Sequence, residues 1–148
     1  MGFQPDHFYM YLSSEYTQSQ LCPNTPRVFV NDFNEKINFT GQWEMAIVNM
    51  AYYPDENVTT PECKPKSIYI LCDSIKSSYT PIGMANVLKR HYLTNEWESL
   101  SGSIAHPEYH RLSANCLSNI KIYITDAYFN LIQLTSGLLA VTLHFRKV

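Results

Sequence analysis

The sequence is short of charge, short of glycine and without a long apolar run. Only 16% of its 148 residues are charged, against ~25% in an average soluble domain. No segment approaches about 18 consecutive apolar residues, so we expect no membrane-spanning helix. The first residues show no basic stretch followed by an apolar run, so we also expect no secretory signal.

The motifs that usually mark catalysis are missing too. The sequence contains no GxSxG, no P-loop and no GxGxxG, and five glycines are too few for a loop that cradles phosphates. A formal net charge of −2 with scattered cations does not give the basic stripe of a nucleic-acid-binding protein. We therefore expect no catalytic site, no cofactor, no metal and no sequence-specific contact with nucleic acid.

Cysteine is present but carries no recognisable chemistry. No CxxC pair occurs, and without a signal peptide the four thiols are expected to be reduced and mostly buried. A small β-fold hydrolase that uses a Cys–His pair remains an alternative, although no local signature marks an activated thiolate. The cysteines are Cys22, Cys63, Cys72 and Cys116.

Two short stretches are candidate ligand sites. In "HPEYH", His106 and His110 are four apart with Glu108 between them, a spacing that on a helix can place two imidazoles on one metal. Pro107 argues against a helix, so a loop with solvated or packed histidines is favoured. Asp73 follows an apolar run, where a turn is a better expectation than a bound ion.

Two sequons, at Asn38 and Asn57, are not expected to be glycosylated unless the chain enters the secretory route.

What the sequence does have is a series of short apolar runs separated by turn residues. The last run sorts cleanly by alternation, with Leu139, Val141, Leu143 and Phe145 on one face. A period of two predicts a strand with one buried face. Residues 83–92 fit either a strand or a short helix. The other predicted strands are 7–14, 27–33, 36–40, 43–53, 66–74, 118–125 and 131–134.

This pattern predicts an all-β fold of two antiparallel sheets packed as a sandwich. We expect about eight strands, one or two short helical turns and one domain over residues 1–148. Jelly rolls and immunoglobulin-like sandwiches both satisfy the pattern. The immunoglobulin alternative, with a loose Cys22–Trp43–Cys72 arrangement, ranks second because Cys22 lies in a proline-rich loop.

Two strands are apolar on both faces, which is unusual for a lone antiparallel sandwich. In 43–53, Trp43, Met45 and Ile47 face one way, and Ala46, Val48 and Met50 the other. Either other copies bury the second face, or loops of the same chain cover it. Eleven tyrosines and the low charge are typical of a surface that binds partners. They are equally typical of an ordinary β protein, because tyrosine favours strands.

Several short motifs follow one another in a fixed order along the chain. The first half contains "FYMYLSS", "PNTP", "VFV", "GQWEMAI" and "YYP"; the second contains "IYILCD", "IGMANVLKR", "EYHRLS" and the three closing strands. The matching residues are Phe8, Tyr9, Leu12, Ser14, Pro23, Asn24, Thr25, Phe29, Val30, Gly41, Trp43, Glu44, Ala46, Ile47, Tyr53, Pro54, Ile68, Tyr69, Cys72, Asp73, Ile82, Gly83, Leu88, Arg90, Tyr109 and Leu112.

This ordered set resembles the penton, or minor capsid, proteins of Maverick/Polinton elements and their adintovirus-like relatives. It departs from them at Ala127-Tyr128, where the family often has a glycine turn, and at "SSY", which replaces Pro-Gln. The resemblance implies a single jelly roll that forms a homopentamer at the vertices of an icosahedral capsid. Its neighbours would be capsomers of a double-jelly-roll major capsid protein. It also implies location in the virion, and inside the cell during assembly.

The alternative is a soluble jelly-roll binding module, either a pentameric chaperone of basic proteins or a carbohydrate binder. Such chaperones usually carry acidic tracts, and this chain has none.

Overall fold

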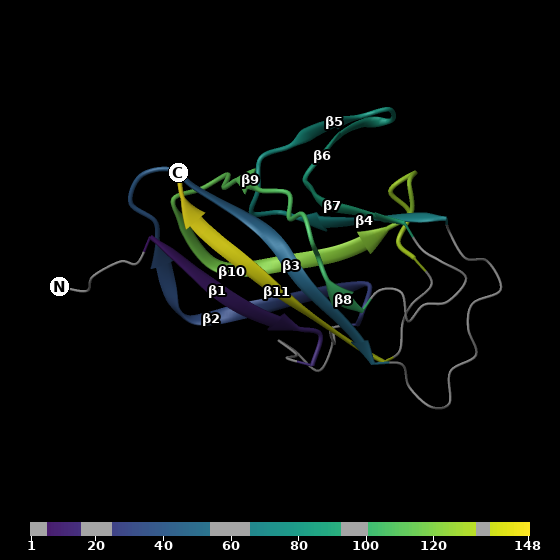
Figure 1. Cartoon of the computed structure of the whole chain (residues 1–148), viewed down its shortest axis with the longest axis horizontal. Helices are drawn as coiled ribbons and strands as arrows, with labels where there is room; N and C mark the ends of the chain where they lie inside the picture. Colours follow the sequence, from purple (N-terminus) through teal and green to yellow (C-terminus); the bar gives the residue numbers. More distant parts are fainter. Residues whose placement is uncertain (1–5, 16–24, 54–65, 93–100, 133–136) are drawn as a thin grey trace.

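The computed structural model describes residues 6–15, 25–53, 66–92, 101–132 and 137–148. Throughout this part the regular structure is β-strand, and no helix occurs (Figure 1). The eleven strands of this part are β1 (His7–Ser13), β2 (Val28–Asn38), β3 (Trp43–Tyr53), β4 (Ser67–Cys72), β5 (Ser78–Thr80), β6 (Gly83–Ala85), β7 (Val87–Tyr92), β8 (Gly102–Ser103), β9 (His110–Arg111), β10 (Cys116–Thr125) and β11 (Leu138–Lys147).

These strands form two larger antiparallel sheets and a separate hairpin. The first sheet has the order β1-β11-β3-β8, with β9 also pairing with β3. The second has the order β2-β10-β4-β7, and β5 pairs only with β6. The hairpin extends away from the two sheets (Figure 1). Most neighbouring strands are therefore far apart in the sequence.

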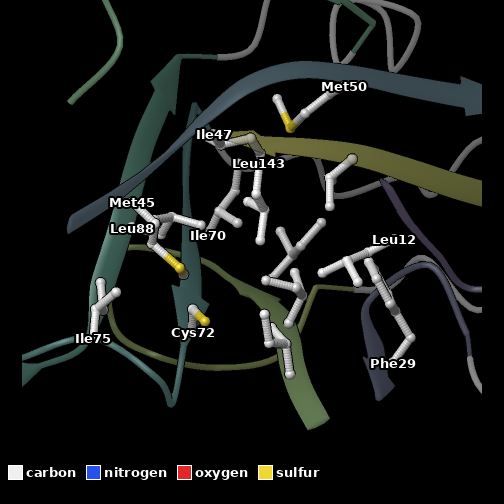
Figure 2. Close-up of a cluster of buried hydrophobic side chains, with 14 of the residues drawn as sticks. Leu12, Phe29, Met45, Ile47, Met50, Ile70, Cys72, Ile75, Leu88 and Leu143 are labelled. Carbon is white, nitrogen blue, oxygen red and sulfur yellow. The ribbon is translucent and has the colours of Figure 1, made fainter. Parts of the chain in front are cut away.

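β11 shows why the closing strand is so regular in the sequence. It lies between β1 and β3, paired antiparallel with both. The alternation predicted for it is confirmed, because Leu139, Val141, Leu143 and Phe145 are all buried. Figure 2 shows side chains from the two sheets pointing toward one another, among them Met45, Ile70 and Leu143. One hydrophobic cluster therefore joins both sheets.

The faces predicted for 43–53 are wrong beyond Val48. The pairing of β3 with β11 shifts between Thr142 and Leu143, which leaves Val48 as an extra residue, a β-bulge. Alternation reverses across such a bulge, so Met50 and Tyr52 join Trp43 in the buried set. The second apolar face assigned to this strand is correspondingly smaller.

The second apolar face of β4 is covered by the same chain. Tyr69 and Leu71 on that face are buried. The Phe129 ring lies 5.7 Å from that of Tyr69, and Arg90 lies 5.8 Å from the Tyr69 ring centre. β4 therefore needs no second copy to bury its two faces, and the alternative in which the chain covers its own strands holds here.

Other expectations need correction in detail. The predicted helical turns do not occur in the described part of the chain, where 83–92 forms β6 and β7. The strand number is above eight because the β5–β6 hairpin and the short β8 and β9 carry too few residues to show periodicity. The strands predicted at 27–33 and 36–40 merge into β2. Of the strand predicted at 131–134, Leu131 makes only an isolated bridge to Thr125, and residues 133–136 lie outside the described part.

Candidate interaction surface

The "HPEYH" stretch does not form a metal site in the described part of the chain. Its first residues lie outside the strands, and His110 begins β9. Glu108 Oε1 lies 3.4 Å from Lys89 Nζ, in an exposed ion pair. The Nε2 atom of His110 is buried and lacks a hydrogen-bond partner in that part. No group of three or more His, Cys, Asp or Glu residues there is placed to hold a metal ion.

Asp73 lies in a turn, directly after the end of β4. Its Oδ1 accepts hydrogen bonds from the Ser74 hydroxyl at 3.3 Å and from the Lys121 backbone N–H at 3.4 Å. Both bonds are long, and the bond from Lys121 ties the end of β4 to β10. The predicted turn is confirmed, and the Asp73 carboxylate stabilises it by accepting hydrogen bonds.

The two sequons can be placed only in part. Asn38 is the last residue of β2 and is exposed, opposite Cys116 of β10. Asn57 lies outside the described residues, as do Cys22 and Cys63.

The two described cysteines are both free thiols with opposite surroundings. Cys72 is buried in the core, and Cys116 is exposed. Burial raises the pKa of the Cys72 thiol to about 12. This is the reverse of the depressed pKa that an activated nucleophile requires. Its burial and raised pKa therefore weigh against Cys72 as the thiolate of a Cys–His hydrolase.

This contrast predicts selective alkylation of the native protein. At about pH 8 a pKa near 12 in place of 9.0 leaves about a thousandfold less thiolate at Cys72. A short iodoacetamide pulse followed by peptide mapping should modify Cys116 at least ~100-fold faster than Cys72. In urea the two rates should converge. Equal rates in the folded protein would contradict the burial of Cys72.

The turn that follows β10 is built without glycine. Asp126 Oδ1 accepts the backbone N–H groups of Tyr128 and Asn130, at 2.9 and 3.0 Å. Phe129 adopts a positive φ of 66°, the left-handed region that glycine usually occupies. An aspartate that bonds the backbone ahead of it stabilises such a turn. The Asp126 carboxylate thus holds the turn that a glycine would otherwise allow.

Large apolar side chains remain exposed in spite of the shared core. Tyr11 is 75% exposed on β1, and Tyr79 is 86% exposed on β5. Six of the ten exposed large hydrophobic residues in the described part are tyrosines, which suit protein contacts because they combine apolar area with a hydroxyl. The ten are Tyr9, Tyr11, Tyr53, Tyr79, Ile82, Met84, Tyr92, Tyr128, Leu131 and Val148.

An apolar groove lies beside the β5–β6 hairpin. It has a volume of about 500 Å³, and its lining includes Leu71, Met84, Tyr123, Phe129 and Leu131. These residues come from β4, β6, β10 and the turn after β10. The groove and the exposed tyrosines are the main apolar features of the described surface.

A cluster of polar aromatic side chains lies where the first and last strands pair. Tyr9 stands opposite His144, and His7 stands opposite Arg146. His7 Nδ1 is 3.1 Å from His144 Nε2, and the Tyr109 hydroxyl is 2.9 Å from His144 Nδ1. Burial, followed by the nearby His7 and Arg146, lowers the pKa of His144. We call these two imidazoles and the Tyr109 phenol the histidine cluster.

The sequence alone gives little sign of this cluster. His144 and Arg146 are recognisable as the polar face of the last strand, but His7 lies 137 residues away. Only the pairing of β1 with β11 brings them together.

A scan against protein-family models and a search of curated proteins both find no match for this sequence. No helix in the described residues is long and apolar enough to cross a membrane.

Proposed function

We propose that this chain is a single jelly roll, with its two sheets packed as a sandwich, that serves as the vertex protein of an icosahedral capsid. It assembles as a homopentamer and contacts a double-jelly-roll major capsid protein. Its role is structural, without catalysis or sequence-specific contact with nucleic acid, and its place is the virion. The immunoglobulin-like sandwich is the competing fold.

The strand pairing is the observation that carries the fold. A jelly roll forms when a long antiparallel hairpin of eight strands rolls up, so that the first strand pairs with the last and each next strand pairs inward. Here β1 pairs with β11, β2 with β10, β3 with β8 and β9, and β4 with β7. If β8 and β9 count as one interrupted strand and the β5–β6 hairpin as an insertion, eight strands remain. All four expected pairings are then present.

The pairing also weighs against the immunoglobulin alternative. In an immunoglobulin-like sandwich the first two strands of the chain share a sheet. Here β1 and β2 belong to different sheets. Cys72, one of the two cysteines of that alternative, is a free thiol.

A fold does not by itself give a function, because jelly rolls occur in capsids, lectins and enzymes. Support for the capsid role comes from the ordered motifs, several of whose residues lie in strands: Phe8 in β1, Trp43 in β3 and Ile68 in β4. The exposed tyrosines and the low charge add to it, since a ring-forming subunit buries such side chains against its neighbours.

The oligomeric state tests the proposal directly. Sedimentation velocity of the purified chain over a wide concentration range should reveal a closed assembly of five subunits, and negative-stain electron microscopy should show rings. A second arm co-expresses the chain with the major capsid protein of the same source, in case vertex assembly needs that partner. A monomer in the first arm, together with empty vertices in the second, would contradict the proposal. Binding on a glycan array by a monomer would favour the carbohydrate-binding alternative.

The exposed tyrosines supply variants for the same measurement. Tyr11→Ser, Tyr79→Ser and Tyr128→Ser each remove apolar surface outside the core, so thermal unfolding of the subunit should change little. At least one of them should shift the association midpoint to higher concentration. If none does, these side chains lie outside the subunit boundary.

A further inference from the structure

The histidine cluster holds two imidazole nitrogens at an unusual separation. His7 Nδ1 and His144 Nε2 are 3.1 Å apart, and the two ring centroids are 5.2 Å apart. Two nitrogen ligands bound to one metal ion at about 2.0–2.1 Å lie ~2.9 Å apart at a right angle and ~3.3 Å apart at the tetrahedral angle. The observed separation falls between these values, so the spacing of the two nitrogens matches that of two ligands on one ion.

The second nitrogen of His144 has a hydrogen-bond partner, as the second nitrogen of a metal-bound histidine usually does. Tyr109 Oη lies 2.9 Å from His144 Nδ1. When Nδ1 carries the proton and donates it to the phenol oxygen, the lone pair of Nε2 faces His7. Hydrogen bonds of this kind fix the tautomer and the ring orientation of histidine ligands. The Tyr9 ring, 4.7 Å from the His144 ring, restrains it further.

The nearby charges do not prevent a cation from binding. Arg146 is the positive group beside the cluster, and its guanidinium lies 3.4 Å from the centre of the Tyr109 ring. Its Nε donates to Glu44 Oε1 at 2.6 Å, so a carboxylate offsets its charge. No third His, Cys, Asp or Glu in the described residues completes a ligand set, which leaves water for the other positions.

We propose that His7 Nδ1 and His144 Nε2 form a two-histidine site for a divalent transition-metal ion, with Tyr109 as the positioning residue. Imidazole ligands suit Cu²⁺, Ni²⁺ and Zn²⁺, and Cu²⁺ binds such sites most tightly. Mg²⁺ and Ca²⁺ prefer oxygen ligands and are not expected to bind here. The site bridges the edge strand β1 and β11, so an occupying ion would fasten the first strand to the last. This inference is independent of the capsid role, since it concerns one subunit.

Isothermal titration of the tag-free full chain with CuCl₂, in a buffer that binds copper weakly, tests the site. We expect one tight site per chain, and the electron paramagnetic resonance spectrum of the complex should show coupling to nitrogen. His7→Ala and His144→Ala should each weaken copper binding by at least ~10-fold. Tyr109→Phe keeps the ring beneath Arg146 but loses the hydroxyl, and should weaken binding by roughly 10-fold or more.

His106→Ala is the matched control, because His106 is an exposed histidine outside the cluster. It should leave the tight site unchanged, and circular dichroism should show each variant folded. ZnCl₂ and NiCl₂ should occupy the same site, and MgCl₂ should give no signal. Absence of a tight copper site in the wild type would overturn the proposal, as would unchanged affinity in both His7→Ala and His144→Ala. The pair would then be a hydrogen-bonded contact only.

Discussion

Phe145→Ala is expected to destabilise the fold by ~3–5 kcal/mol, the range for removing a large buried aromatic side chain. Phe145 is fully buried. Its ring stacks on that of Phe8 at 4.8 Å between centroids and on that of Phe39 at 5.7 Å. The substitution therefore leaves a cavity between Phe8 of β1 and Phe39, which directly follows β2, at the C-terminal end of β11.

Urea denaturation followed by circular dichroism measures this effect as a change in the free energy of unfolding. Val148→Ala, three residues further along, serves as the control because Val148 is 59% exposed. Its effect should stay within about 0.5 kcal/mol. A loss below ~1 kcal/mol for Phe145→Ala would mean that the surrounding rings collapse into the space, and would contradict the packing described here.

The closing strand was predictable because alternation is a local signal. Every second residue from Leu139 to Phe145 is apolar, and one buried face follows from that alone. The bulge at Val48 was not predictable, because it depends on the pairing of β3 with β11 and not on the composition of β3. A single inserted residue was enough to move Met50 from the predicted outer face to the core.

The sequence also could not predict that other parts of the same chain cover the second apolar face of β4. The sequence shows that Tyr69 is apolar, but not that Phe129 and Arg90 lie against its ring. The extent of the exposed surface, on which the case for subunit contacts depends, is therefore a property of the tertiary structure. The tyrosine content and the low charge indicate only that the exposed surface is rich in aromatic side chains and poor in charge.

The histidine cluster illustrates the same limit for the candidate site. Alternation places His7 with Tyr9, and His144 with Arg146, each on the outer face of its strand. Their contact requires that the first and last strands be neighbours in register. Motif spacing drew attention instead to His106 and His110, which lie close in sequence and form no metal site in the described part of the chain.

Asn31 is a polar residue between Phe29 and Phe33 on the apolar face of β2. This position in the sequence already indicates a buried side chain with hydrogen-bond partners. Its side chain is buried and acts as a strand partner for the end of β1. Asn31 Oδ1 accepts the Ser13 backbone N–H at 2.9 Å, and Asn31 Nδ2 donates to the Ser13 carbonyl oxygen at 2.9 Å. One amide thus joins an edge strand of the first sheet to an edge strand of the second.

Asn31→Ala is therefore expected to lower the free energy of unfolding by ~2–4 kcal/mol, because each buried backbone group left unpaired costs ~1–3 kcal/mol. Asn34→Ala makes the same change on the same strand at an exposed position, and should stay within about 0.5 kcal/mol. Hydrogen exchange provides a second measurement, since the Ser13 amide proton should lose protection in Asn31→Ala and keep it in Asn34→Ala. An Asn31→Ala variant as stable as the wild type, with Ser13 still protected, would show that β1 is held by β11 alone. The Asn31–Ser13 hydrogen bonds would then contribute nothing to joining the two sheets at this corner.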